Sequence, residues 1–239
     1  MTSTTPKPID YDPRADKPGD PLDFWAYILP MGVFLAFTAM GGWWPQFYTL
    51  SYVIKTIAAA ATMYWFWPHY TKIRWNYWWL GVVVGIIGIL QWIPMQLWLQ
   101  HHVAFFKIDE ADAFNPFKHF EGRPGLMWSF IAIRLADAVL VVPVMEELFW
   151  RDWLWRTTLA PNDFKLARVG EWSPSALLIV SGMFSLVHGN WWLTAIVWGL
   201  MVGLLLVWTK SLGACIVAHG VTNLLLGLYV LRTNEWFFW

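Results

Sequence analysis

The sequence predicts an all-α protein: a polytopic transmembrane bundle of about seven helices, with six to eight as the range. Apolar residues make up 58% of the 239 residues and charged residues only 13%, whereas soluble proteins carry about 25% charged residues. The chain contains 21 Trp, 16 Phe and 8 Tyr, and aromatic rings of this kind gather where a membrane meets water. The apolar residues also fall into long runs, close to the ~20 residues that a spanning helix needs.

The runs define the elements in order. Residues 1–23 are polar and rich in proline, so we expect a flexible cytoplasmic tail. The second predicted span contains Lys55, whose ammonium we expect to reach the outer interface. The fifth span is short and ends at His188-Gly189-Asn190, which indicates a tight turn into the sixth. The predicted spans are 24–44, 47–68, 76–99, 126–155, 174–188, 191–209 and 212–231.

Basic residues in the loops predict the orientation. Cytoplasmic loops of membrane proteins carry an excess of Lys and Arg, which favours a cytoplasmic N-terminus and a C-terminus on the outside. The formal net charge is +0, with 16 basic and 16 acidic residues, so the expected partner is the lipid bilayer and not a nucleic acid. The basic residues expected inside are Lys7, Arg14, Lys17, Lys72, Arg74, Arg156, Lys165, Arg168 and Lys210; those expected outside are Lys107, Lys118, Arg123 and Arg232.

Other polar positions are given structural roles. Cys215, the single cysteine, lies in an apolar stretch and is expected to be a buried core residue. Arg134 and Asp137 are three residues apart in one span and are expected to pair. The segment 100–125 fits no known metal-ligand spacing, so we expect a solvated interfacial loop; its titratable residues include His101, His102, His119, Asp109, Glu110 and Asp112.

Three motifs in the second half place ionisable or amide groups inside spans, where a central charge costs about 2.5–3.5 kcal/mol. The first is EELFWR, residues 146–151. On a helix Glu147 and Arg151 share a face and can neutralise each other, which leaves Glu146 without that partner and suited to act as a general base. Pro143, just upstream, removes a backbone hydrogen bond and can kink the helix.

The second motif is FSLVH, residues 184–188, and the third is HGVTN, residues 219–223, in which His219 and Asn223 share a helix face. At ~1.5 Å per residue, Glu146, His188 and His219 all lie within a side chain's reach of a common layer. Alone, each motif also fits a structural role: ion pairs at a membrane edge, an interfacial histidine, or hydrogen bonds between helices. Spans 4, 5 and 7 must be neighbours if the motifs meet.

Together, in this order, the three motifs resemble the CAAX prenyl protease and bacteriocin-processing family (CPBP, or Abi) of intramembrane endopeptidases. The resemblance covers residues 125–231, and the lead-in Ser211-Leu212-Gly213 to the third motif is similar too. It implies that residues 24–239 form one transmembrane domain with its catalytic half at about 125–231. It also implies a protein of the bacterial inner (plasma) membrane that acts on a peptide or protein substrate near the membrane.

The resemblance implies a role for each motif residue. Glu146 would activate a water molecule with help from His188, and His219 and Asn223 would stabilise the oxyanion. Glu147 and Arg151 would hold the site together. A neutral imidazole and an amide are donors that such an oxyanion needs where bulk water is scarce.

Alternatives stay open at the level of the sequence. We prefer a glutamate-type mechanism without a cofactor, but Zn²⁺ accepts two His and one Glu, so Glu146, His188 and His219 would be its ligands if a metal is present. The chain also fits a non-catalytic membrane immunity or interaction protein of the same family. A third reading is a small proton-coupled transporter.

Overall fold

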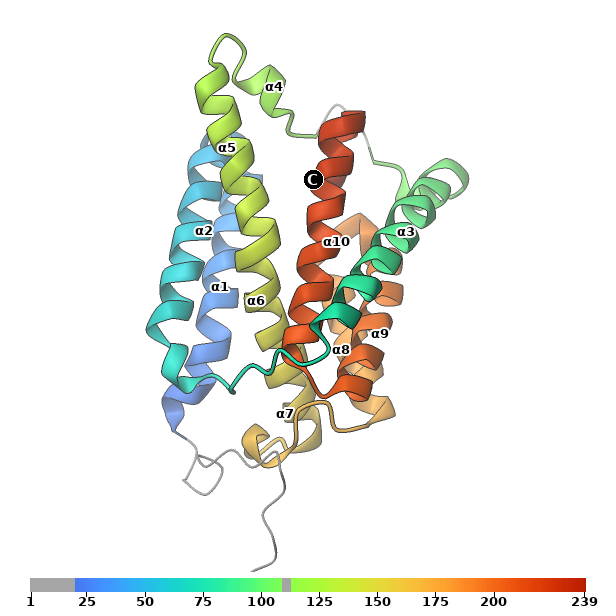
Figure 1. Ribbon diagram of the computed structural model, residues 1–239. Helices are drawn as coiled ribbons and strands as arrows, with labels where there is room; N and C mark the ends of the chain where they lie inside the picture. Colours follow the sequence, from blue (N-terminus) through green and yellow to red (C-terminus); the bar gives the residue numbers. More distant parts are fainter. Residues whose placement is uncertain (1–19, 109–112) are drawn as a thin grey trace, which may run out of the picture.

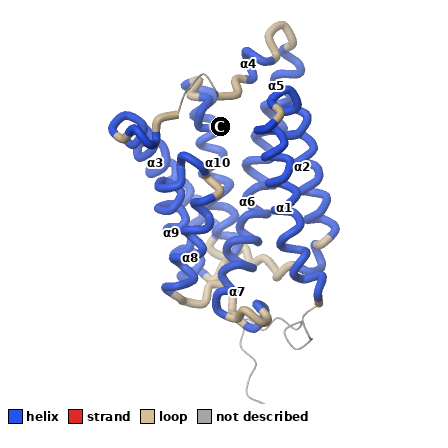
Figure 2. Tube along the Cα trace, turned by 180° about the vertical axis from the view of Figure 1, so that it is seen from behind, coloured by secondary structure: helices blue, strands red, loops and turns tan. Residues whose placement is uncertain are grey.

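The computed structural model describes residues 20–108 and 113–239. The expected tail up to residue 19, together with Asp109, Glu110 and Asp112, lies outside these residues. Every regular element of the described chain is helical, without a strand among them (Figures 1 and 2). The predicted all-α class is therefore confirmed.

Helices occupy the seven predicted regions of the described chain. The fourth is one continuous helix, Pro124–Leu159, of 36 residues, longer than the predicted 126–155. It consists of α5, α6 and α7, which are joined by π-helical turns at Asp137–Val141 and Leu148–Leu154. The bounds are α1 Pro21–Trp43, α2 Tyr48–Trp65, α3 Trp78–His102, α4 Pro116–His119, α5 Pro124–Ala136, α6 Val142–Glu147, α7 Trp155–Leu159, α8 Pro174–Leu186, α9 Trp192–Thr209 and α10 Leu212–Thr233.

Five of these helices are long and apolar enough to cross a membrane, and they support an integral membrane protein. α8 is apolar but has only 13 residues, in agreement with the short fifth span that the sequence predicts. The five long helices are Pro21–Trp43, Trp78–His102, Pro124–Leu159, Gly189–Thr209 (α9 with the turn before it) and Leu212–Thr233.

The helices form two groups around a central pair (Figure 1). α1 and α2 pack side by side on one flank, and α3, α8 and α9 form the other. The continuous α5–α7 helix and α10 lie between the groups and contact each other through α6 and the π-helical turn Asp137–Val141. Two of the three motif-bearing segments therefore meet directly at the centre of the bundle.

α3 approaches α10 very closely because α3 presents glycines. A Cβ atom added at Gly85 would lie 2.7 Å from the carbonyl oxygen of Ala218 and 2.7 Å from the Cβ atom of Val221. Small residues let helix backbones approach in a membrane, where packing rather than water exclusion holds helices together. The Thr222 hydroxyl uses this approach and donates to the Gly85 carbonyl at 3.1 Å.

The lead-in to α10 has a clear structural role. Ser211 caps the helix, because its hydroxyl accepts from the Ala214 N–H at 3.1 Å and satisfies a donor that a helix start leaves free. Its hydroxyl also lies 2.8 Å from the Arg74 carbonyl. A Cβ atom at Gly213 would lie 2.4 Å from that same carbonyl oxygen, so the serine and the glycine together fix α10 against the segment before α3.

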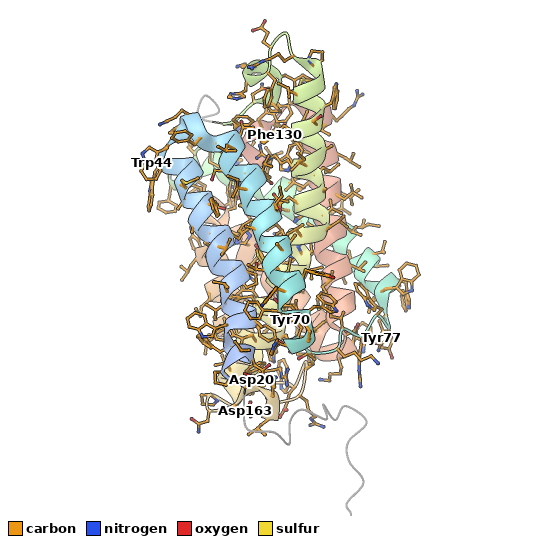
Figure 3. All side chains as sticks on the ribbon, turned by 90° about the vertical axis from the view of Figure 1, so that its left-hand side faces the viewer. Asp20, Trp44, Tyr70, Tyr77, Phe130 and Asp163 are labelled. Carbon is orange, nitrogen blue, oxygen red and sulfur yellow. The ribbon has the colours of Figure 1, made fainter. Side chains whose placement is uncertain are left out.

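A buried polar network joins the lower ends of the helices. Asp152 accepts from Tyr27 at 2.6 Å and from Arg156 at 2.7 Å, and Lys165 pairs with Asp23. All but the tyrosine are charged, and each is less than 8% exposed. Figure 3 shows the labelled Asp20 and Asp163 at this end and Trp44 at the opposite end of α1. The network ties α1 to the end of the α5–α7 helix.

Exposed aromatic side chains mark both ends of the bundle, as expected for the two interfaces of a membrane. Figure 3 places Tyr77 at the lower end and Trp44 at the upper end. The helix starts and ends also separate the two predicted sets of basic residues as far as these lie in residues 20–108 and 113–239; which set faces the cytoplasm stays a prediction. Exposed aromatics include Tyr64, Trp65, Trp78, Trp79 and Trp208 at the lower end, and Trp43, Trp44, Trp98 and Trp128 at the upper end.

We predict that Gly85→Ala destabilises the protein by about 1–3 kcal/mol, because the added methyl group overpacks the contact between α3 and α10. Gly32→Ala, within α1, is the matched control, since nothing lies within 4 Å of a Cβ atom there. Thermal unfolding of the purified protein in detergent measures both. Equal melting temperatures for the two variants would contradict the close packing.

Candidate active site

Glu147 links the first and third motifs. Its Oε1 atom lies 2.8 Å from Nδ1 of His219 on α10 and 3.2 Å from Nη1 of Arg151. Oε2 lies 3.2 Å from Nε of Arg151. Glu147 and Arg151 are both 0% exposed, so the contact that the spacing predicts within EELFWR is present and extends to a histidine far along the chain.

Glu146 is buried beside this group but is bound differently. It is 8% exposed, and its Oε2 atom has no hydrogen-bond partner. The charged or titratable groups that act on its carboxylate are His219, Glu147 and Arg151. Trp150, one turn further on, approaches the carboxylate without completing a hydrogen bond. Glu146 is thus a buried carboxylate whose Oε2 atom can still accept a hydrogen bond.

His188 follows the end of α8 and is half-buried. Its Nδ1 atom lies 2.7 Å from the Phe184 carbonyl; a carbonyl only accepts, so Nδ1 carries the proton and Nε2 of the neutral ring has a free lone pair. The imidazole packs on the Phe184 ring at 4.2 Å between centroids and against Trp92 of α3 at 5.9 Å. The spacing within FSLVH therefore places a hydrogen-bond acceptor and a packing ring one turn before the histidine.

Trp198 of α9 completes the site and was missed by the sequence reasoning. Its ring lies 4.7 Å from that of His219 and stacks on Phe184 at 5.2 Å. The Arg151 guanidinium lies over both aromatic rings, at 4.7 Å from Phe184 and 5.3 Å from Trp198, which favours a cation there. A signal existed: this tryptophan lies in the middle of an apolar run, away from the interfaces where tryptophan usually gathers.

Asn223 is half-buried, and its Nδ2 atom donates to the Ala138 carbonyl at 2.8 Å. That carbonyl lies in a π-helical turn, in which the Val142 N–H donates to the Asp137 carbonyl. In this register the Ala138 carbonyl would accept from residue 143, which is proline and has no N–H. The amide of Asn223 replaces the missing donor, and its second N–H remains for another acceptor.

The four expected catalytic residues therefore come together in part. Glu147, Arg151 and His219 are in direct contact. Glu146 is the neighbour of Glu147 on α6, and the rings of His188 and His219 lie 4.2 Å and 6.5 Å from the ring of Phe184. In the described chain no hydrogen bond joins Glu146 to His188, and no group of three or more His, Cys, Asp or Glu side chains is arranged to hold a metal ion.

Two sequence-based expectations are wrong. Lys55 does not reach the outer interface: it is 7% exposed, and its Nζ atom lies 3.7 Å from Oδ2 of Asp137. Asp137 therefore pairs across to α2 and not with Arg134 on its own helix. Arg134 instead lies among aromatic rings, the nearest being Trp239 at 4.9 Å. Sequence spacing reports pairs within a helix and carries no information on pairs between helices.

The fold and the site together define a polytopic helical membrane protein with a buried glutamate, histidine and arginine centre. A family model described as Rce1-like, type II CAAX prenyl endopeptidase Rce1-like, matches residues 127–225. The match confirms, for this segment, the resemblance to the CAAX prenyl protease family that the three motifs indicate. At the level of the family it supports a CAAX-type intramembrane protease.

The matched segment begins within α5 and ends within α10. It contains all three motifs, whereas α1, α2 and α3 lie outside it. No curated protein and no solved structure matches the chain.

We predict that Arg151→Met destabilises the protein by about 3–5 kcal/mol, because it leaves the Glu147 carboxylate buried without its cation. The double variant with Glu147→Leu should lose less than the sum of the two single variants, since no lone charge remains. Chemical unfolding in mixed micelles measures the three values.

The same substitution at Arg168 is the control, since Arg168 and Glu171 form an exposed pair with side chains 63% and 40% exposed. Such surface pairs contribute about 0–1 kcal/mol. Strict additivity of the Arg151 and Glu147 substitutions would contradict a coupled buried pair.

Proposed function

We propose that this protein is an intramembrane endopeptidase in which Glu146 and His188 activate a water molecule to cleave a peptide bond. The observation that carries the proposal is the buried Glu146 carboxylate, whose Oε2 atom has no hydrogen-bond partner. The adjacent Glu147 is bound to Arg151 and His219. A carboxylate with a free acceptor atom is what a general base needs, provided that it lies within hydrogen-bond reach of water.

His188 supports the same step. Because its Nδ1–H is committed to the Phe184 carbonyl, Nε2 is the acceptor. The water would donate one proton to Glu146 and its second hydrogen bond to this nitrogen. The aromatic rings of Phe184 and Trp92 hold the imidazole in place, so little reorganisation accompanies the reaction.

The oxyanion would be stabilised by His219 and Asn223. Glu147 takes the Nδ1–H of His219, so a neutral ring has no N–H on Nε2, and the donor role through Nε2 belongs to the imidazolium form. Asn223 supplies the N–H that is not used by Ala138. Donors fixed before the reaction in a site with little water contribute strongly to catalysis.

The reaction balances with these groups alone. Glu146 takes a proton from water, and the resulting hydroxide attacks the carbonyl carbon to form a tetrahedral oxyanion. The oxyanion collapses, the C–N bond breaks, and the proton on Glu146 passes to the departing amine. The substrate class is a membrane-associated protein or peptide. The family description names CAAX prenyl substrates, which gives one of the two probes below.

We predict that Glu146→Gln lowers cleavage by about 10²–10⁴-fold, because the amide is nearly the same shape but takes no proton. The probes are a quenched fluorescent peptide that ends in a prenylated Cys-aliphatic-aliphatic-X sequence and a pool of unprenylated decapeptides read by mass spectrometry. Both are given to the purified protein in nanodiscs, with and without a chelator. Loss of cleavage with the chelator would instead favour the metal-dependent alternative.

Glu171→Gln is the matched control, since this glutamate is exposed at the surface and should leave cleavage unchanged. The Glu146 variant must retain the elution profile and melting temperature of the parent. Cleavage by Glu146→Gln at the parent's rate, or no cleavage of either probe by the parent, would contradict the proposal.

A further inference from the structure

We propose that Lys55, on α2, is a positioning residue of the active site: through Asp137 it holds the π-helical turn that fixes Asn223 and leads into Glu146. The effect on catalysis rests on the proposed protease activity, whereas the effect on the π-helical turn does not depend on it. Lys55 lies outside the segment that matches the family, so the proposal assigns a task to the N-terminal helices.

Lys55 is bound by charge and by aromatic faces. Its ammonium lies 3.7 Å from the Asp137 carboxylate, 3.9 Å from the centre of the Tyr52 ring and 4.1 Å from that of Phe34. A buried ion pair seldom adds net stability, because both ions lose their hydration. Lipid offers no water in exchange, and charged groups at this depth mark functional places by default.

Asp137 is the first residue of the π-helical turn Asp137–Val141. It is 0% exposed, and its ionic partner is Lys55 on another helix. Tyr52 and Thr56 of α2 approach the same carboxylate without completing a hydrogen bond. α2 therefore contacts the α5–α7 helix at the turn where the backbone hydrogen bonds change from the α-helical to the π-helical pattern.

The register of this turn matters for the site. It leaves the Ala138 carbonyl for Asn223, which donates to it at 2.8 Å, and it places α6, with Glu146 and Glu147, directly after the turn. π-Helical turns inside α-helices are costly and often occur at functional sites. Relaxation of the turn to a regular α-helix would rotate the residues that follow relative to α10.

The electrostatic surroundings of Lys55 extend beyond Asp137. Besides Asp137, the charged groups that act on Lys55 are Arg134 and Glu146. Loss of the ammonium would leave the buried Asp137 carboxylate without the cation that α2 supplies.

The test combines kinetics with hydrogen exchange on the full chain in nanodiscs. Lys55→Met removes the charge and keeps the length of the side chain. We expect kcat to fall by about 10²-fold, the usual cost of a misplacement near 1 Å, with KM unchanged. The two peptide probes described above provide the assay. Exchange of backbone amides should rise in the segment 137–147 and stay unchanged in α3.

Three further variants sharpen the result. Lys55→Arg keeps the cation and should restore both readouts. Asp137→Asn should match Lys55→Met, and the double variant should be no slower than either single one, because the two residues act as a unit. Lys72→Met, the same substitution at an exposed lysine, should behave as the parent.

Unchanged exchange in the segment 137–147 of Lys55→Met would overturn the proposal, as would faster exchange spread equally over all helices. Failure of Lys55→Arg to restore the parent's behaviour would also overturn it. Failure of the protease proposal looks different: the parent then cleaves neither probe, while the local rise in exchange persists.

Discussion

The bundle depends on one buried contact, in which the Glu147 carboxylate binds Arg151 on its own helix and His219 on α10. Lipid supplies no water to replace a lost partner, so each member of this group needs the other two. Because Glu147 and His219 come from helices far apart in the sequence, their contact sets the rotation of α6 and α10 relative to each other. That rotation in turn directs Asn223, one turn beyond His219, at the α5–α7 helix.

Aromatic rings complete the same centre. Phe184 packs against His188, Trp198 and the Arg151 guanidinium, so a single side chain of the second motif contacts groups from three segments. The rings accept a cation on their faces while they exclude water, which strengthens the interactions of every charge enclosed between them. The phenylalanine of FSLVH is thereby as much part of the site as its histidine.

The sequence predicts the helices and the contacts within a single helix. It does not predict the contacts between helices that are far apart along the chain. The seven helical regions follow from runs of apolar residues, and the Glu147–Arg151 contact follows from a spacing of four. The Lys55–Asp137 pair has no such pattern, because the sequence of one helix does not specify which helix packs against it. Arg134 is the cation closer to Asp137 in the sequence. The proline at 143 signalled a disturbed helix, but the π-helical turn and its partner Asn223 depend on α10 lying alongside.

The two adjacent glutamates, Glu146 and Glu147, have different surroundings although they lie on one helix. Neighbouring residues on a helix point about 100° apart, so Glu146 and Glu147 cannot both face Arg151. Glu147 contacts both the Arg151 guanidinium and the His219 imidazole, whereas no ion pair or hydrogen bond within the described chain holds Oε2 of Glu146. If both carboxylates were paired, the proposed protease would have no free base; if neither were, the cost of two buried charges would open the bundle. The division of roles thus follows from helix geometry and from the single arginine one turn away.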